Sequence, residues 1–342
     1  EVAIFAGQRK PASIRRIVKA GLVLSIIVSL IVALLIQVIP ELLLLAGQSS
    51  GSIGYAEQYL SAAVWISFPA FAFLVLRGLA AGMGYTTSIM RISLLAVAVN
   101  VPVSYALMTG WGWFPEMGLA GVALGTVAGS SFMMILLAAD LWRYPEVRRI
   151  LASLFSVRLT RSDFLPFWTL GVPIALAWVM EGGVFTAATL MAGTISVAAL
   201  AAHQIALQTA AVSFNVYIGF AQGAAIRIGQ SYGRREVANV RRYAWVGLSL
   251  GAIFCMVAAA VFVLLPDLIV DLFTLGGEGD MDAEVRELGI SLLLVAALFQ
   301  LVDGGQVIMM TALRALRMGM PPTIVTVIGY WVIGFPVAWY LM

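Results

Sequence analysis

Two acidic side chains, Glu181 and Asp303, lie deep inside long apolar stretches of this sequence, and each is followed by two glycines. A charge at the centre of a bilayer costs about 2.5–3.5 kcal/mol on insertion scales, so such residues usually face a cavity and serve an ion or substrate pathway. The glycines leave room for backbone or a hydrated ion beside each carboxylate. Two carboxylates in one low-dielectric cavity repel each other unless one is protonated or a cation lies between them. The pair therefore predicts a proton or Na⁺ site, with Glu181 and Asp303 as the metal ligands if the ion is sodium.

Two other interpretations of this pair stay open. The acids could be structural groups that only bond to neighbouring helices, or they could be a catalytic acid and base. The catalytic interpretation is the weaker one, because no hydrolase, zinc-peptidase or nucleotide-binding signature accompanies the acids. We therefore expect a protein that is not an enzyme.

Three more residues in these stretches could line the same cavity. Gln306 follows Asp303 by three residues, so the two share one helix face, and its amide can donate or accept a hydrogen bond. Phe299 and Tyr217 suit an adaptable apolar wall.

Two polar residues at the edges of the apolar stretches have two interpretations each. His203 either senses pH or is a hydrogen-bonded residue near a helix end. Asn100 lies just before Pro102, where it either bonds to backbone carbonyls that the proline frees or contacts substrate.

The composition sets the class of protein that must position these residues. Of 342 residues, 62% are hydrophobic and only 11% are charged, and the mean hydropathy is +1.00. An average globular chain is roughly 45–50% apolar and about 25% charged. The net charge of +3 is too small for a nucleic-acid surface. The single cysteine excludes an intrachain disulfide framework. These values predict an all-α, polytopic membrane protein.

Apolar stretches long enough to cross about 30 Å of hydrocarbon as a helix recur along the chain. We expect nine transmembrane helices, near residues 20–39, 60–82, 89–109, 118–140, 165–191, 198–226, 243–266, 288–312 and 320–341. Nearly all Lys and Arg fall in alternate connections, and acidic residues gather in the others. By the excess of positive charge on the cytoplasmic side, residue 1 should be cytoplasmic.

The two halves of the chain share residues in the same order. Gly21 and Pro40 have the same 19-residue spacing as Gly247 and Pro266. The other matches are Gly7-Gln8 with Gly229-Gln230, Leu76-Arg77 with Leu313-Arg314, and Pro102-Val103 with Pro336-Val337. The sequence therefore predicts a structural repeat.

The repeat predicts two pseudo-symmetric six-helix lobes in the intact protein, with two helices before this sequence and one after it. We expect an N-lobe at residues 1–142, a cytoplasmic linker at 143–163 and a C-lobe at 164–342. Because six is even, equivalent helices run in the same direction. Such parallel repeats are typical of transporters, with substrate bound between the halves.

Several segments resemble a known family. The run from Phe114 to Thr126 is similar to the fifth-to-sixth helix signature of the MATE (multidrug and toxic compound extrusion) transporters. The segments 171–175, 202–207 and 303–307 resemble the NorM-like branch of that family.

The resemblance implies a twelve-helix protein of which this chain holds the third to eleventh helices, N-lobe helices 3–6 and C-lobe helices 7–11. It also implies that Glu181 and Asp303 couple transport to a cation. The aromatic residue near the tenth-helix acid, often Tyr in the family, is Phe299 here.

We therefore expect a secondary active antiporter of the cell inner membrane that exports organic, cationic and amphipathic drugs or metabolites. It would exchange them for Na⁺ or H⁺ by alternating access of the two lobes. Its partners would be these small molecules and the lipid bilayer, with no nucleic acid, no cofactor beyond the coupling ion and a monomeric state. The alternatives are a lipid or lipid-linked saccharide flippase of the same superfamily and, less favoured, a membrane-embedded enzyme or a receptor.

Overall fold

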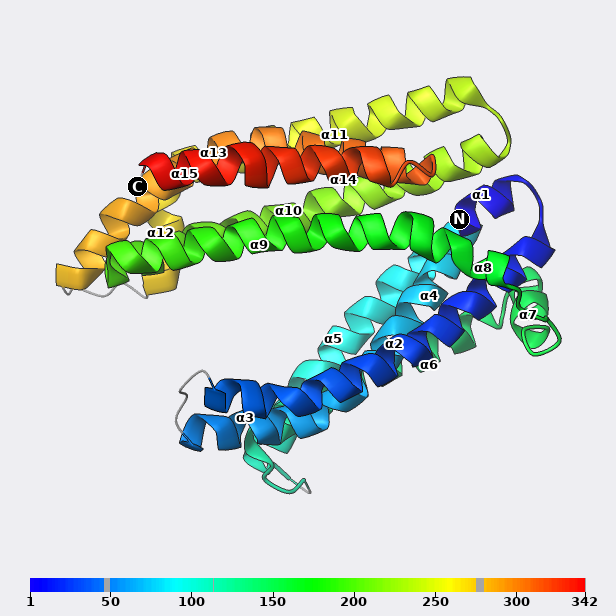
Figure 1. Cartoon of the computed structure of the whole chain (residues 1–342), viewed down its shortest axis with the longest axis horizontal. Helices are drawn as coiled ribbons and strands as arrows, with labels where there is room; N and C mark the ends of the chain where they lie inside the picture. Colours follow the sequence, from blue (N-terminus) through cyan, green and yellow to red (C-terminus); the bar gives the residue numbers. More distant parts are fainter. Residues whose placement is uncertain (46–49, 113, 275–279, 342) are drawn as a thin grey trace. The chain divides into compact units, whose positions relative to one another are not determined.

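The computed structural model describes residues 1–45, 50–112, 114–274 and 280–341, and its regular elements are all helices (Figure 1). Nine helical spans in this described part are long and apolar enough to cross a membrane. They are Pro11–Leu45, Ile53–Met83, Thr86–Thr109, Gly118–Leu141, Arg161–Ile195, Val197–Gly233, Val237–Leu264, Ala283–Ala315 and Met320–Tyr340. The predicted all-α bundle of nine spans is therefore confirmed.

The chain divides into two compact units, Glu1–Phe164 and Leu165–Met342. The connection that we expected to be a linker, residues 143–163, includes the short helix α7 (Pro145–Ala152). It is tied to the first unit, because the Lys19 ammonium donates a hydrogen bond to the Val157 carbonyl at 2.7 Å. The assignment of the two units as lobes of a larger repeat stays a prediction.

The first unit consists of a short helix followed by four spans. Besides α7, its elements are α1 (Val2–Gly7), α2 (Pro11–Leu45), α3 (Ser50–Ala63), the 3₁₀ turn η1 (Val64–Ile66), α4 (Ser67–Met83), α5 (Thr86–Thr109) and α6 (Gly118–Leu141). Helices α5 and α6 pack closely because glycines of α6 face α5. A Cβ atom on Gly129 would lie 2.7 Å from the Asn100 amide nitrogen, so no larger residue fits there without movement.

The second unit contains the two acids. Its elements are α8 (Arg161–Pro166), which spans the division between the units, the π turn η2 (Phe167–Gly171), α9 (Val172–Ile195), α10 (Val197–Gly233), α11 (Val237–Leu264), α12 (Pro266–Thr274), α13 (Asp280–Ala315), α14 (Met320–Val327), the π turn η3 (Ile328–Gly334) and α15 (Phe335–Leu341). Helix α13 lies against both α10 and α11, and α14 lies against α9 (Figure 1). Ile205, Phe262 and Leu293 form part of the buried core at one end of these helices.

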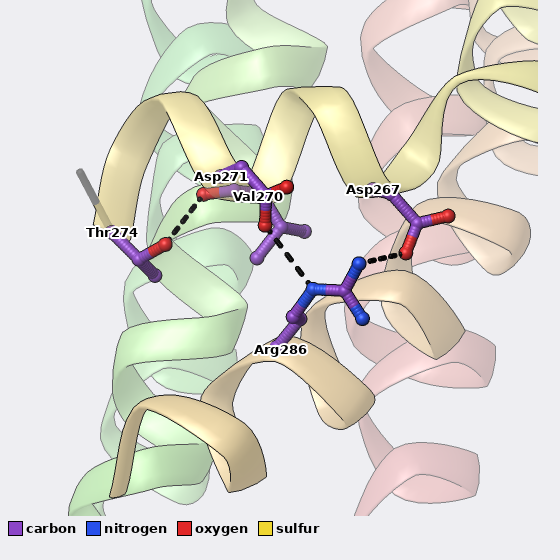
Figure 2. Close-up of polar contacts among 5 residues, drawn as sticks. All are labelled: Asp267, Val270, Asp271, Thr274 and Arg286. Atoms are coloured by element: carbon purple, nitrogen blue, oxygen red, sulfur yellow. Dashed lines mark hydrogen bonds and ion pairs between the residues drawn. The ribbon is translucent and has the colours of Figure 1, made fainter. Parts of the chain in front are cut away.

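The short helix α12 is held against α13 by one arginine and by one buried side chain. Arg286 of α13 pairs with Asp267 and donates a second hydrogen bond to Asp271 at 3.1 Å, and both acids belong to α12 (Figure 2). Between these acids, Val270 is fully buried in the core. The ion pairs of Arg286 therefore lie beside a buried apolar contact made by Val270.

The turn between α1 and α2 recurs between α10 and α11. Arg9 and Arg235 both adopt the left-handed conformation, with φ of 56° and 63°. Each donates its N–H to the carbonyl three residues earlier, at 3.0 and 3.1 Å. The helices before these turns end at Gly7 and Gly233. Gly7 thus corresponds to Gly233, and the match with Gly229 that the sequence suggested is wrong by about one helical turn.

A second pair of turns also repeats. Between α4 and α5, the N–H of Tyr85 donates to the Ala80 carbonyl at 2.8 Å. Between α13 and α14, the N–H of Met318 donates to the Leu313 carbonyl at 3.0 Å. Leu313 therefore corresponds to Ala80 rather than to Leu76, again a difference of about one helical turn.

The second half of the repeat has one more residue than the first between the paired turns and the matched prolines. The paired turns place Met318 233 positions after Tyr85, whereas Pro336 follows Pro102 by 234 positions. Helix α5 is continuous over this stretch, while the second unit contains the π turn η3. The extra residue is Gly319, because α5 begins directly after Tyr85, whereas Gly319 separates Met318 from the start of α14. The π turn η3 is a separate difference between the halves, and such turns are frequent at functional sites.

Candidate functional site

Asp303 lies in the middle of α13 and is buried, with 3% of its surface exposed. The hydroxyl of Tyr217 on α10, also buried, donates a hydrogen bond to Asp303 Oδ2. Within the described part of the chain, Oδ1 of the same carboxylate has no hydrogen-bond partner. One oxygen is therefore fixed and the other is available to a ligand.

Gln300, one helical turn before Asp303, is fully buried, and neither its Oε1 nor its Nε2 has a partner among the described residues. Leaving a buried polar group unpaired costs about 1–3 kcal/mol, and such groups call for a bound water or ion. Gln300 was missed in the sequence interpretation because an uncharged amide does not stand out. Its spacing of three residues from Asp303, on the same helix face, was the signal that could have identified it.

Glu181 of α9 is buried and lies close enough to Asp303 for the two charges to interact. The charge of Arg314, near the end of α13, also acts on it. The structure therefore brings the two predicted acids into one electrostatic environment. In the described ranges, no three His, Cys, Asp or Glu side chains are placed to hold a metal ion together, so a cation here would need neutral oxygen ligands besides the two acids.

An aromatic wall lies beside the acids. Phe185 of α9 packs against Phe299 of α13 with ring centroids 6.1 Å apart, and against Tyr330 of η3 at 6.5 Å. The amide of Gln306 donates a hydrogen bond to the Tyr330 hydroxyl at 3.1 Å. Phe299 has no hydroxyl, but Tyr330 brings one near the acids from η3, and it interacts electrostatically with Glu181. Tyr330 was missed in the sequence interpretation.

The glycines that follow the two acids have two different environments. A Cβ atom on Gly183 would lie 3.0 Å from the Trp331 ring, and one on Gly304 would overlap the Cys255 sulfur. Atoms added to Gly182 or Gly305 would meet nothing within 4 Å. In each pair, therefore, one glycine permits close helix packing and the other leaves open space. Only the second kind fits the prediction that these glycines make room for an ion.

Trp331 joins η3 to the acid-bearing helix. Its indole Nε1 donates a hydrogen bond to the Met180 carbonyl at 2.9 Å. Met180 directly precedes Glu181 in α9. The π turn η3 thus carries both Tyr330 and Trp331 to the site.

Two predicted residues do not belong to this cluster. His203 precedes Tyr217 by 14 residues on α10, which corresponds to roughly 21 Å along the helix. Its Nε2 is buried without a partner among the described residues. Asn100 belongs to the first unit, where its amide donates to the Gly125 carbonyl at 2.9 Å. That bond favours the helix-packing interpretation of Asn100.

Comparison with known proteins agrees with this architecture. The family model MatE matches residues 2–106 and 173–340. A probable multidrug resistance protein NorM from Rhizobium meliloti (strain 1021) is 35% identical over 341 residues, which cover 99% of this chain and 72% of that protein. The protein of the same name from Brucella suis biovar 1 (strain 1330) is 32% identical, over 98% of this chain and 71% of its own.

Solved structures resemble this chain in fold. The crystal structure of MATE in complex with MaL6 superposes with a TM-score of 0.88 at 17% identity, over 99% of this chain and 74% of that one. A MOP superfamily transporter from Pyrococcus furiosus gives a TM-score of 0.83 at 17% identity, over 99% and 74%. At this identity the likeness is one of fold alone.

Proposed function

Since this chain belongs to the MatE family of transporters, we propose that it is a secondary antiporter that exports organic, cationic and amphipathic compounds in exchange for a cation. The names of its relatives, multidrug resistance proteins, support this substrate class. We place the protein in the cell inner membrane as a monomer that carries out no covalent chemistry. The flippase alternative is not favoured, because the relatives are named for drug resistance.

One observation carries the proposal: a buried carboxylate with a free oxygen lies near a second buried acid. Oδ1 of Asp303 and both polar atoms of Gln300 lack partners in the described part of the chain, and Glu181 is within electrostatic range. Carboxylate and amide oxygens are hard ligands that suit a cation such as Na⁺. A proton on either acid would also remove their repulsion. A Na⁺ ion could be bound by the Gln300 amide oxygen as well as by a carboxylate oxygen, so we favour Na⁺ as the coupling ion.

The site also suits an organic cation. Phe185, Phe299 and Tyr330 present aromatic rings beside the acids, and a cation is attracted to the face of such a ring. Substrate and coupling ion would both seek the charge of Glu181 and Asp303. Binding of one therefore weakens binding of the other, and linkage requires the effect to be reciprocal. This competition is the physical basis of exchange.

The test is transport by single-site variants of the full-length protein in vesicles. Glu181→Gln and Asp303→Asn keep the size of each side chain and remove its charge. Each should abolish export driven by an ion gradient while leaving membrane insertion unchanged. Full export by both variants would overturn the assignment.

A matched control is Glu57→Gln. Glu57 is an exposed acid of α3 in the first unit. Its neutralisation should leave export intact, so that loss of activity in the site variants cannot be attributed to a general loss of negative charge.

A further inference from the structure

A cavity of about 660 Å³ lies in the first unit, between the start of α5 and the end of α6. Arg91 and Arg143 line it together with Asp140 and the hydroxyl groups of Ser88 and Tyr144. It is separate from the acids and aromatic residues described above, which belong to the second unit. The transport mechanism assigns it no role.

The polar wall of the cavity carries positive charge that is free to bind an anion. Arg143 pairs with Asp140 at 3.6 Å, but the Arg143 side chain is 82% exposed. Exposed pairs of this kind contribute little to stability, so Arg143 can turn to an incoming anion at little cost. Arg91 makes no ion pair or hydrogen bond within the described ranges. The residues that line the cavity include two arginines and one acid, so their formal net charge is positive.

The lining changes from polar to apolar along the helices. Ser88 lies in the first turn of α5, whereas Leu95 lies two turns further along, about 10 Å deeper. Leu136 of α6, one turn before Asp140, faces the same deeper part. Basic residues gather at this end of the helices, the end that should face the cytoplasm. The gradient thus runs from a charged membrane boundary into the hydrocarbon region.

Stacked rings hold one wall of the charged end in place. Tyr144 stacks on Tyr85 with centroids 3.9 Å apart, and its hydroxyl lies 3.5 Å from the Ser88 hydroxyl. The charged end therefore presents hydroxyl donors beside its guanidinium groups, a combination that suits a phosphate ester.

We propose that this cavity binds one anionic phospholipid of the cytoplasmic leaflet. Its phosphate lies between Arg91 and Arg143, and an acyl chain follows the apolar wall. Basic pockets between transmembrane helices on the cytoplasmic side suit such head groups. A soluble phosphate ester shares the head-group chemistry but would leave the apolar wall without a ligand.

Titration of the purified full-length protein with dioleoyl phosphatidylglycerol, followed by native mass spectrometry, tests the site. The wild type should bind this lipid in preference to dioleoyl phosphatidylcholine and to glycerol 3-phosphate. Arg91→Gln/Arg143→Gln should weaken its binding about tenfold or more, since each basic residue near an anionic surface contributes about 1 kcal/mol. Arg241→Gln/Arg242→Gln, a pair of exposed arginines on α11, is the matched control and should bind the lipid as the wild type does.

Three outcomes would overturn the proposal. The first is a double variant at Arg91 and Arg143 that binds phosphatidylglycerol as tightly as the wild type. The second is equal binding of glycerol 3-phosphate, which would indicate a site for free phosphate esters. The third is no preference for the anionic lipid in the wild type, which is the expected result if another part of the full-length chain fills the cavity. None of these results bears on gradient-driven export.

Discussion

The hydroxyl of Tyr217 on α10 donates a hydrogen bond to Oδ2 of Asp303 on α13, and both side chains are buried. The two residues are 86 positions apart, so the bond connects two helices that are distant in sequence. It fixes one carboxylate oxygen, while Oδ1 has no partner among the residues that the structure describes and can meet a ligand. Tyr217 thus orients the acid that we propose for cation coupling.

Tyr217→Phe should therefore weaken the response to Na⁺. A hydrogen bond to a charged group contributes about 1.5–3 kcal/mol, so loss of the hydroxyl should shift the Na⁺ midpoint by about tenfold. Tryptophan fluorescence at fixed pH would report this shift, because Trp178 packs near Tyr217 through Phe214. Tyr232→Phe, further along α10 and exposed, is the control. An unchanged midpoint in Tyr217→Phe would contradict the orienting role.

Gln300→Leu should weaken ion binding without lowering the thermal stability of the ion-free protein. Removing two unpaired buried polar atoms removes a cost of about 1–3 kcal/mol, so the ion-free variant should melt at the same or a higher temperature. The increase in Tm that Na⁺ produces at fixed pH should become smaller, since one oxygen ligand is lost. Gln208→Leu changes an exposed glutamine of α10 and should alter neither quantity. A full Na⁺ response in Gln300→Leu would remove Gln300 from the site.

Local signals in the sequence predicted a large part of this molecule. Hydropathy identified the nine spans, because a membrane helix must be apolar over its whole length. Ionisable residues are rare in such helices, so Glu181 and Asp303 stood out without any knowledge of contacts. Tyr217 was predicted as a cavity residue, but its hydrogen bond to Asp303 was not, and Tyr330 was not predicted at all, because each contact joins helices far apart in the chain.

The register of the repeat shows another limit of sequence reasoning. Gly229 and Gly233 lie one helical turn apart on the same face of α10. A match of short motifs cannot separate two such positions. The turn hydrogen bonds at Arg9 and Arg235 do separate them, because a left-handed residue marks a single position in each half.

Gly304→Ala should destabilise the second unit, because the added methyl group would overlap the sulfur of Cys255. Overpacking of this kind costs about 1–3 kcal/mol. Cys255→Ala should largely restore stability in the double variant, and a double-mutant cycle measures that coupling. Gly305→Ala is the matched control, since its added methyl group meets nothing within 4 Å. Equal losses of Tm in the two glycine variants would show that the sulfur contact is not the cause.

The attachment of α12 to α13 should depend more on Val270 than on Arg286. The Arg286 pairs with Asp267 and Asp271 are about half exposed (Figure 2), and such pairs contribute about 0.2–1 kcal/mol. Val270→Ala removes two buried methyl groups, at about 0.8 kcal/mol each. Hydrogen exchange in α12 should therefore accelerate more in Val270→Ala than in Arg286→Met.

Ionic strength distinguishes the contribution of the Arg286 ion pairs from that of the buried Val270 side chain. Raising the ionic strength should reduce the difference in the hydrogen-exchange rate of α12 between Arg286→Met and the wild type, because exposed ion pairs are screened by salt. The difference in this rate between Val270→Ala and the wild type should not change, since salt does not screen an apolar contact. A larger effect of Arg286→Met at every salt concentration would mean that the ion pairs, and not the buried valine, hold α12 against α13.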